Sequence, residues 1–292
     1  MQADAVLAVV VTYHPPPELA DHLRAIRGQV GALVVVDNGS PDWQLTEALC
    51  AEIGASFIRN LRNEGIARAL NQGVEQAQAG GYGWLAMFDQ DSSLPDGTIV
   101  ALVALAARHP QAERVGIVAT SFRDRHLGRT YHDPANTLVD GPDWREVRTL
   151  ITSGSLVRVD TFTRMGGFDE RLFIDFVDHE HCLRLRRAGW LLLQSKSIFL
   201  DHAIGKLSSH RFLGRTVHCS NHSPARRYYI TRNQLEYYRR CLFHEPYLAF
   251  WGFSNLVMRS VLVVLYEEHR PAKARAILRG LWHFAIRRFG AL

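Results

Sequence analysis

The stretch AVLAVVVTYH, residues 5–14, is an unbroken apolar run that ends in three polar residues. Such a run, rich in β-branched side chains and without polar alternation, predicts a strand that is buried on both faces of a parallel sheet. The runs ALVVVD at 32–37 and WLAMFD at 84–89 repeat the pattern, and each ends in an acid. Because helical patterns separate the runs, the order β-α-β-α-β predicts a doubly wound sheet. Ligands of such sheets bind at the carboxyl ends of the strands, where these polar residues fall.

The remaining pattern extends this α/β order along the chain. It predicts a further short strand at 56–60, strands at 115–120 and 190–202, and a looser polar segment that reaches residue 148. Residues 151–170 favour a strand, a short helix and a Gly-Gly turn. Helices are predicted at 15–26, 46–54, 65–81, 97–110 and 178–189, and a helical, basic region from 223 onward. We expect a domain at 1–222 and a helical C-terminal region at 223–292.

Composition indicates a soluble globular protein. The hydrophobic content is 47% and the charged content 22%, which excludes wholesale disorder. The four cysteines contain no CxxC pair, which favours a reducing compartment and argues against a disulfide framework or a zinc site. The first residues lack the basic start of a signal peptide, so none is expected.

Charge is unevenly distributed along the chain. Residues 203–292 carry 15 Lys and Arg against 4 Asp and Glu, a net charge of +11, while residues 1–202 carry −6. A basic tail suggests an anionic partner such as nucleic acid, phosphate groups or an anionic membrane surface. Residues 247–266 have the length of a bilayer span, but Asn255, Arg259 and Ser260 interrupt them. An interfacial helical region is the favoured interpretation, with a span and a buried core helix as alternatives.

The pair Asp89 and Asp91 is the first candidate site. In a strand, side chains at i and i+2 point to the same side, so the two carboxylates would converge while Gln90 points away. Converging acids repel each other unless a cation lies between them and a ligand. Mg²⁺ or Mn²⁺, completed by substrate phosphates, fits this pattern. The alternative is a solvated turn before the next helix.

An ordered set of motifs then identifies a resemblance. The segments are VVVTYH at 9–14, VVVDNGS at 34–40, RNEGIARALNQG at 62–73, FDQDSS at 88–93, GGFDERLFIDFVDHEHCLRLRRAG at 166–189, LDHAIG at 200–205 and RRYYITRN at 226–233. In this order the set resembles the family 2 glycosyltransferases, which have a GT-A fold. That fold is a Rossmann-like, mostly parallel sheet flanked by helices. The variants at 88–92 and 173–184 resemble in particular the bacterial rhamnosyltransferase branch, which uses dTDP-L-rhamnose.

The resemblance implies roles for individual residues. Thr12, Tyr13 and Asp37 would hold the nucleobase, and Asn63 and Arg68 would lie near the nucleotide and its phosphates. Asp89 would contact the nucleotide sugar, Gln90 is counted among the donor contacts, and Asp91 would ligate the metal. His202 matches a position that supplies a further metal or diphosphate contact, although a structural role is an even alternative. Arg227 or Arg232 could reach the donor diphosphate or an anionic acceptor, or lie on a solvated basic helix.

The catalytic base is expected in the segment around 173–184. Inverting transfer needs a carboxylate that takes the proton from the acceptor hydroxyl, and the resemblance aligns Asp178 with that position. Glu180 falls on a neighbouring acidic position, whereas Asp175 does not. The family usually has a Glu-Asp pair where this chain has Val177 and Asp178, so a companion acid is missing. An acidic cluster at a helix N-terminus would also be stabilised by the helix dipole.

These observations predict an inverting, metal-dependent glycosyltransferase, peripheral on the cytoplasmic face of the membrane. It would transfer L-rhamnose from dTDP-L-rhamnose to a saccharide or lipid-linked acceptor in lipopolysaccharide, O-antigen or rhamnolipid synthesis. One alternative keeps the fold but uses a UDP-sugar donor carrying galactose, galactofuranose or N-acetylglucosamine. A more distant one is a basic nucleic-acid-binding protein; it leaves the acidic strand ends unexplained, so no nucleic-acid partner is expected.

Overall fold

The structure is a computed structural model that describes residues 3–124, 130–131, 133–202, 208–212 and 214–292. The chain forms two compact units. The first unit contains residues 1–169 and 178–203, and the second contains residues 170–177 and 204–292. The units divide near residue 203, whereas the domain boundary after residue 222 stays a prediction.

The parallel half of the main sheet is built from the apolar runs. Its strands, in spatial order, are β3 (Ser56–Arg59), β2 (Ala32–Asp37), β1 (Val6–Thr12) and β4 (Trp84–Asp89). All neighbouring pairs in this half are parallel. Every residue of β1 is buried, as expected for a strand covered on both faces. This half confirms that these predicted strands run parallel.

The other half of the sheet is mixed. From β4 the order continues through β9 (Ser155–Arg158), β5 (Val115–Asp124), β10 (Leu191–His202), β8 (Trp144–Val147) and β7 (Thr137–Asp140), while β6 (Thr130–Tyr131) pairs with β5. β9 lies antiparallel between β4 and β5, and β10 is parallel to β5. The segment up to residue 148, expected to be loose, therefore supplies the short strands β6 to β8. Their pairing partners lie far away in sequence, so local pattern could not reveal them.

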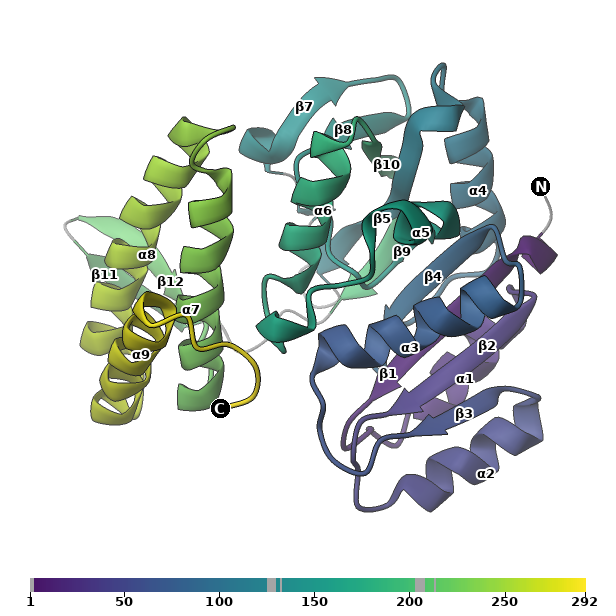
Figure 1. Cartoon of the computed structure of the whole chain (residues 1–292), viewed down its shortest axis with the longest axis horizontal. Helices are drawn as coiled ribbons and strands as arrows, with labels where there is room; N and C mark the ends of the chain where they lie inside the picture. The colour runs from purple at the N-terminus through teal and green to yellow at the C-terminus, as the bar shows by residue number, and fades with distance from the viewer. Residues whose placement is uncertain (1–2, 125–129, 132, 203–207, 213) are drawn as a thin grey trace. The chain divides into compact units, whose positions relative to one another are not determined.

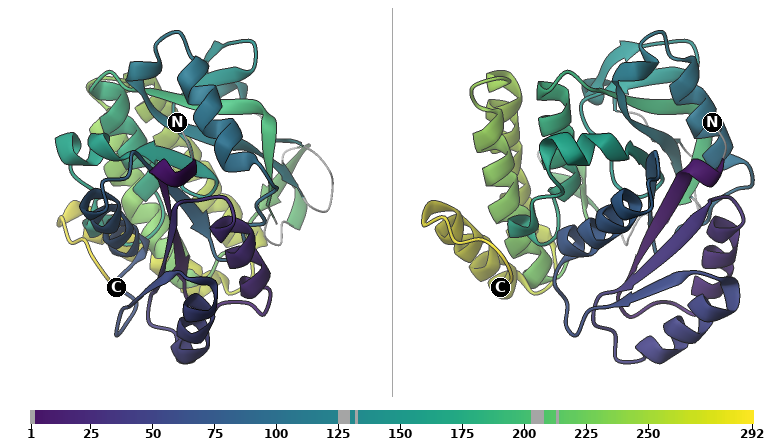
Figure 2. Two further views of the ribbon diagram at one scale, coloured as in Figure 1. Left: turned by 90° about the vertical axis from the view of Figure 1, so that its right-hand side faces the viewer. Right: turned by 45° about the vertical axis from the view of Figure 1, so that its right-hand side comes forward.

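Helices cover both faces of this sheet, as Figures 1 and 2 show. The helices of the first unit are α1 (Leu19–Arg27), α2 (Trp43–Ile53), α3 (Ile66–Ala79), α4 (Thr98–Arg108), α5 (Val159–Met165) and α6 (Val177–Arg187). Val177, the first residue of α6, belongs to the second unit. Val6, Ala8 and Val10 of β1 face a core that α1, α2 and α4 complete. Val9 faces the opposite side, where Gly73 of α3 rests so closely that a Cβ at Gly73 would come within 2.6 Å of the Val9 side chain. The first unit is thus a three-layer α/β/α sandwich, and the predicted fold class is confirmed.

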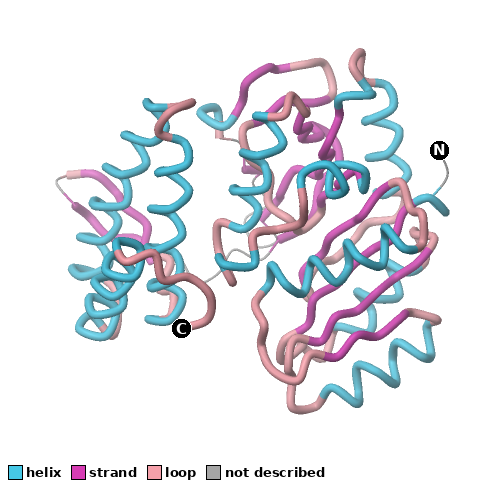
Figure 3. The backbone as a smooth tube through the Cα atoms, in the orientation of Figure 1, coloured by secondary structure: helices cyan, strands magenta, loops and turns pink. Residues whose placement is uncertain are grey.

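The second unit is mainly helical. It contains α7 (Pro224–Cys241), α8 (Pro246–Tyr266) and α9 (Arg270–Ala285), which pack on one another, and a hairpin of β11 (Ser208–Phe212) and β12 (Arg215–Cys219) (Figure 3). Ser223 caps α7 by accepting a hydrogen bond from the backbone N–H of Arg226 at 3.2 Å. The helices were expected from the sequence, but the hairpin was not.

Candidate active site

Three strand ends meet at one edge of the sheet. The register pairs Thr12 with Asp37 across β1 and β2, and Val11 with Asp89 across β1 and β4. The polar residues that end the apolar runs are therefore neighbours, as the sequence predicts. This edge is where a doubly wound sheet binds its ligand.

Asp37 shapes the turn that follows β2. Its carboxylate accepts hydrogen bonds from Thr12 Oγ1 at 3.0 Å, from the Ser40 N–H at 2.8 Å and from the Gly39 N–H at 3.2 Å. Gly39 has φ +92°, and a Cβ there would meet the Arg62 backbone at 2.6 Å, so the turn requires glycine. Thr12 and Asp37 are both 0% exposed. Their predicted contact with a nucleobase stays a prediction.

Asn38 connects this turn to the start of α3. Its Nδ2 donates to Asn63 Oδ1 at 3.1 Å, and its Oδ1 accepts from Asn60 Nδ2 and from the Glu64 N–H, both at 3.1 Å. Asn63 Oδ1 also accepts from the N–H of Gly65, the residue before α3. Asn63 is exposed, and its predicted position near the nucleotide stays a prediction. Asn38 is a positioning residue to which the sequence analysis gave no role.

Arg68 lies one turn further along α3. Its guanidinium forms an ion pair with Glu75 at 3.0 Å and is partly exposed. The predicted proximity of Arg68 to the phosphates therefore stays a prediction.

The two acids of the DQD motif lie in a turn rather than along a strand. β4 ends at Asp89, and the Ser92 N–H donates to the Asp89 carbonyl at 3.1 Å, which folds Gln90 and Asp91 into the turn. The argument that i and i+2 converge on one face of a strand was therefore wrong for Asp91. Asp91 is exposed and Asp89 is partly buried.

Gln90 joins this turn to the end of β1. Its Oε1 accepts from the Tyr13 N–H at 2.8 Å and its Nε2 donates to the Tyr13 carbonyl at 3.3 Å. The Tyr13 ring stays 45% exposed and stands edge-on to His14. Tyr13 is thus an exposed aromatic face beside the acids, the type of surface on which a nucleobase stacks. Gln90 holds that surface in place.

A cation fits this edge only as part of a substrate complex. Among the described residues, no group of three or more His, Cys, Asp or Glu side chains is placed to hold a metal ion. The turn offers the carboxylates of Asp89 and Asp91, and Mg²⁺ or Mn²⁺ bound by one or two carboxylates takes its remaining ligands from phosphates and water. His202 ends β10, but its side chain lies outside the described residues, so its predicted metal contact is not assessed.

Asp178 stands in the first turn of α6. Its Oδ1 accepts from the His179 N–H at 2.8 Å and lies 2.9 Å from His179 Nδ1. Burial by itself would raise the pKa of the Asp178 carboxyl, but the charge and the hydrogen bonds of His179 outweigh burial and hold that pKa below its ordinary value. Asp178 is therefore ionised at neutral pH, as a proton acceptor must be. His179 directly follows the predicted base in the sequence, but its role as the hydrogen-bond partner of the Asp178 carboxylate was not predicted.

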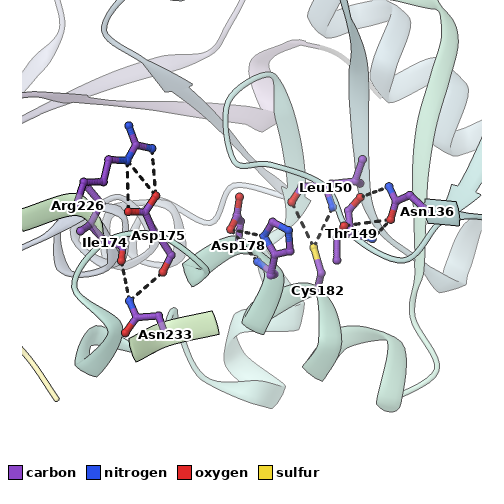
Figure 4. Close-up of polar contacts among 10 residues, drawn as sticks. Asn136, Thr149, Leu150, Ile174, Asp175, Asp178, Cys182, Arg226 and Asn233 are labelled. Carbon is purple, nitrogen blue, oxygen red and sulfur yellow. Dashed lines mark hydrogen bonds and ion pairs between the residues drawn. The ribbon is translucent and has the colours of Figure 1, made fainter. Parts of the chain in front are cut away.

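Asp178 is connected to the strand-end turn through the residues before β9. A cavity of about 10 Å³ is lined by Asp178, Met87, Thr152 and others. Next to Thr152, Ser153 Oγ lies 2.8 Å from Ser92 Oγ and 3.4 Å from the Asp89 nitrogen. Figure 4 shows Asp178 with the neighbouring contact between Cys182 and Leu150. Asp178 therefore lines a cavity with Thr152, and the next residue, Ser153, contacts the DQD turn.

Glu180 and His181 are buried on the inner side of α6. The Glu180 carboxylate accepts a hydrogen bond from Arg184 Nε at 2.9 Å and forms an ion pair with that arginine. The His181 ring stacks on Phe162 and contacts Phe168, and its Nε2 has no hydrogen-bond partner among the described residues. Burial, and then the charge of Arg184, lowers the pKa of His181 to about 3.

In the second unit, the segment before Asp178 has an unusual backbone. Phe173, Asp175 and Phe176 have φ between +62° and +68°, a conformation that is costly for residues other than glycine. Asn233 Nδ2 donates to the carbonyls of Leu172, Ile174 and Asp175, and Arg226 forms an ion pair with Asp175 at 3.0 Å (Figure 4). Asp175 therefore has a structural partner, in agreement with its exclusion as the base.

The predicted phosphate-binding arginines of α7 are enclosed in the second unit. Arg232 is 0% exposed and donates to Tyr228 Oη and to backbone carbonyls of Leu172 and Gly290. Arg227 is buried against Glu267. These contacts give both residues a structural role, and their predicted donor binding stays a prediction.

The fold is of the GT-A type, and comparisons with known proteins identify the class of enzyme. The family model described as Glycosyl transferase family 2 matches residues 7–166. The chain belongs to this family and is a glycosyltransferase.

Two relatives and one solved structure illustrate the similarity. The chain is 33% identical over 238 residues to the dTDP-rhamnosyl transferase RfbF of Shigella flexneri, covering 78% of each chain. It is 28% identical over 237 residues to an N-acetylglucosaminyl-diphospho-decaprenol L-rhamnosyltransferase of Mycobacterium tuberculosis, covering 68% of this chain and 76% of the relative. The crystal structure of S. aureus TarS in complex with UDP-GlcNAc superposes with a TM-score of 0.61 at 15% identity, covering 98% of this chain and 82% of TarS. At that identity the TarS likeness supports the fold alone.

Proposed function

We propose that this glycosyltransferase transfers L-rhamnose from dTDP-L-rhamnose, with inversion, to a saccharide or lipid-linked acceptor. The donor assignment is supported by the name of the relative from Shigella flexneri. A lipid-linked acceptor is supported by the name of the mycobacterial rhamnosyltransferase, which specifies a diphospho-decaprenol substrate. The observation that carries the proposal is the ionised Asp178, which lines a cavity with Thr152, next to the Ser153 that contacts the DQD turn.

The chain's own residues suggest how transfer proceeds. Tyr13 offers its exposed ring to the nucleobase, and Asn63, which is hydrogen-bonded to Asn38, would lie near the nucleotide. Asp89 and Asp91 would hold Mg²⁺ or Mn²⁺, which would supply stabilisation of the charge that develops on the diphosphate leaving group. Asp178 takes the proton from the acceptor hydroxyl as the oxygen attacks the anomeric carbon. His179 keeps the carboxylate ionised and oriented.

A donor panel tests the substrate. The protein is incubated with dTDP-rhamnose, UDP-galactose, UDP-galactofuranose or UDP-N-acetylglucosamine and Mn²⁺ or Mg²⁺, and the released nucleotide is measured. Preferential release of dTDP is the expected result. Preferential release of UDP would favour the alternative that the galactofuranosyltransferase GlfT1 relative represents, at 31% identity over 207 residues.

Asp178→Asn tests the base. Loss of a general base costs about 10²- to 10⁴-fold in rate, while nucleotide binding should be retained. Asp21→Asn, at an exposed acid of α1, is the matched control. An Asp178→Asn variant as active as this control would refute the assignment.

We also propose a peripheral location on the cytoplasmic face of the membrane. Within the described ranges, α8 is the one helix long and apolar enough to cross a bilayer, and only 28% of its most apolar window is buried. A core helix would be mostly buried, so this exposure favours contact with lipid.

A further inference from the structure

Helix α8 has two apolar faces. One face packs inside the second unit through Ala249, Gly252, Leu256 and Val263. The other face carries apolar residues that recur at steps of three and four, so they form one stripe along the α-helix. Its exposed members are Tyr247, Phe250, Trp251, Val257, Met258, Val261, Val264 and Leu265. Arg259, which argues against a span, falls outside this stripe.

The stripe continues onto α9. Leu278, Leu281 and Trp282 are exposed on α9, and Ile286 follows its end. α8 and α9 pack on each other and on α7. A groove of about 500 Å³ runs between the three helices, and its lining, which includes Phe253, Val257 and Val261, is almost entirely apolar. We call these exposed residues of α8 and α9, with the groove, the α8–α9 face.

This surface requires a partner. Exposed contiguous apolar patches of this kind are rare on soluble monomers and mark interaction sites. Phe250 is 74% exposed, Trp282 63% and Trp251 49%, so the second unit leaves these large aromatic rings partly in solvent. Tyr and Trp are also the residues that settle at the boundary between water and lipid.

The charges around the face indicate which partner. Arg275 and Arg279 are exposed, and each lies three residues before an exposed apolar residue of α9, Leu278 and Trp282. Residues at that spacing are neighbours on a helix surface. Arg270 and Arg288 are exposed too, and Glu268 is the exposed acid of this segment. A second copy of the chain would bring these arginines together, whereas anionic headgroups complement them.

We propose that the α8–α9 face enters one leaflet of an anionic bilayer. α8 and α9 lie along the membrane plane, with the apolar stripe among the lipid acyl chains and one acyl chain in the groove. Arg275 and Arg279 then contact the lipid headgroups. This inference specifies the surface behind the proposed peripheral location. It does not depend on the identity of the donor sugar.

Vesicle sedimentation of the full chain tests the proposal. Binding to phosphatidylcholine vesicles that contain phosphatidylglycerol is expected to be strong, weaker without phosphatidylglycerol, and reduced by salt. Phe250→Ser combined with Trp251→Ser should weaken binding at least about tenfold, because two interfacial aromatic anchors are removed. Arg275→Glu combined with Arg279→Glu should abolish the preference for phosphatidylglycerol. Leu61→Ser, at an 86% exposed residue of the first unit, is the control.

Two further measurements separate the alternatives. Analytical ultracentrifugation without lipid should show a monomer; a dimer that Phe250→Ser dissociates would replace the membrane with a second copy. Wild-type protein that ignores both vesicle types, or a Phe250/Trp251 variant that binds as well as wild type, would overturn the proposal. Donor hydrolysis in solution should be unchanged in these variants. Vesicle binding by a chain that hydrolyses no nucleotide sugar would refute the proposed function and leave this inference standing.

Discussion

At the scale of single residues, the pair Asp178 and His179 governs the ionisation of the predicted base. His179 offsets the effect of burial and holds the pKa of Asp178 below its ordinary value. In His179→Gln the positive charge is lost, so the pKa of Asp178 should rise. At acidic pH a smaller fraction of Asp178 is then ionised, and the acid limb of the kcat/KM profile for transfer should move to higher pH. A profile identical to that of wild type would exclude His179 as the partner of the base.

His181 makes a separate prediction about stability. Its pKa is about 3 in the folded chain, against an ordinary value near 6.5. Between about pH 3 and pH 6.5 the unfolded chain therefore binds a proton at His181 that the folded chain does not bind. The contribution of this histidine to the free energy of unfolding is complete above about pH 6.5 and is lost as pH falls toward 3. The loss is about 1.4 kcal/mol for each pH unit. His181→Phe preserves the stacking on Phe162 and should flatten the dependence of urea-unfolding free energy on pH by that amount; an unchanged slope would contradict it.

The sequence predicted where chemistry-bearing residues gather, but not how each one is engaged. The end of an apolar run marks a strand end, so Thr12, Asp37 and Asp89 were correctly placed together. The burial of Arg232 depends on partners such as Gly290, 58 residues away. No local pattern carries that information, and an arginine in a basic helix looks the same whether it faces phosphate or backbone carbonyls.

At the scale of elements, the contact between α3 and β1 can be tested through one glycine. Alanine normally stabilises a helix interior over glycine by about 1 kcal/mol. In Gly73→Ala, however, the new Cβ would lie 2.6 Å from Val9, so the free energy of unfolding should instead fall by about 1–3 kcal/mol. Chemical denaturation measures the change. Gly28→Ala, whose Cβ meets nothing closer than 3.6 Å, is the control and should be nearly neutral.

A double variant then isolates that contact. Val9→Ala removes the two methyl groups that lie 2.6 and 3.0 Å from the new Cβ but keeps the Val9 Cβ at 2.7 Å, so Gly73→Ala should cost less in that background than in wild type without becoming neutral. Equal costs in both backgrounds would mean that the Val9 methyl groups do not resist the new Cβ.

Elements with strong periodicity were predicted well, and weakly patterned ones were not. Gly54 ends α2 with φ +67°, as the glycine after an apolar-periodic segment predicts. The hairpin of β11 and β12 carries polar residues on both sides of its turn, and β6 to β8 are two to four residues long. Short polar strands gain their stability from pairing rather than from pattern, so a single sequence does not reveal them.

At the scale of the whole molecule, charge and function are divided between two units. The strand-end site and Asp178 belong to the first unit, and the α8–α9 face belongs to the second. The basic excess of the tail partly serves its own interior, because Arg227 and Lys273 meet the buried Glu267, while Arg239, Arg240 and Arg287 meet Glu236. Much of the positive charge that could suggest nucleic-acid binding is therefore paired with acids inside the second unit.

This division predicts how ligands change thermal unfolding. A ligand at a hundred times its Kd stabilises the unit that binds it by about 2.7 kcal/mol, which corresponds to a rise in Tm of about 5–10 °C for a unit of this size. With dTDP and Mn²⁺, calorimetry should show this rise for the first unit, and any separate transition of the second unit should stay in place. A chelator should reverse most of the rise, because it removes the cation that we propose to join the diphosphate to Asp89 and Asp91. Asp91→Asn should have the same effect as the chelator, and Tyr13→Ala should weaken dTDP binding with or without metal. Asp21→Asn should behave as wild type.

Two outcomes would contradict these assignments. A rise in Tm with UDP and none with dTDP would transfer the donor assignment to UDP-sugars. A dTDP response that is unchanged in both Asp91→Asn and Tyr13→Ala would mean that the nucleotide does not bind at this edge of the sheet.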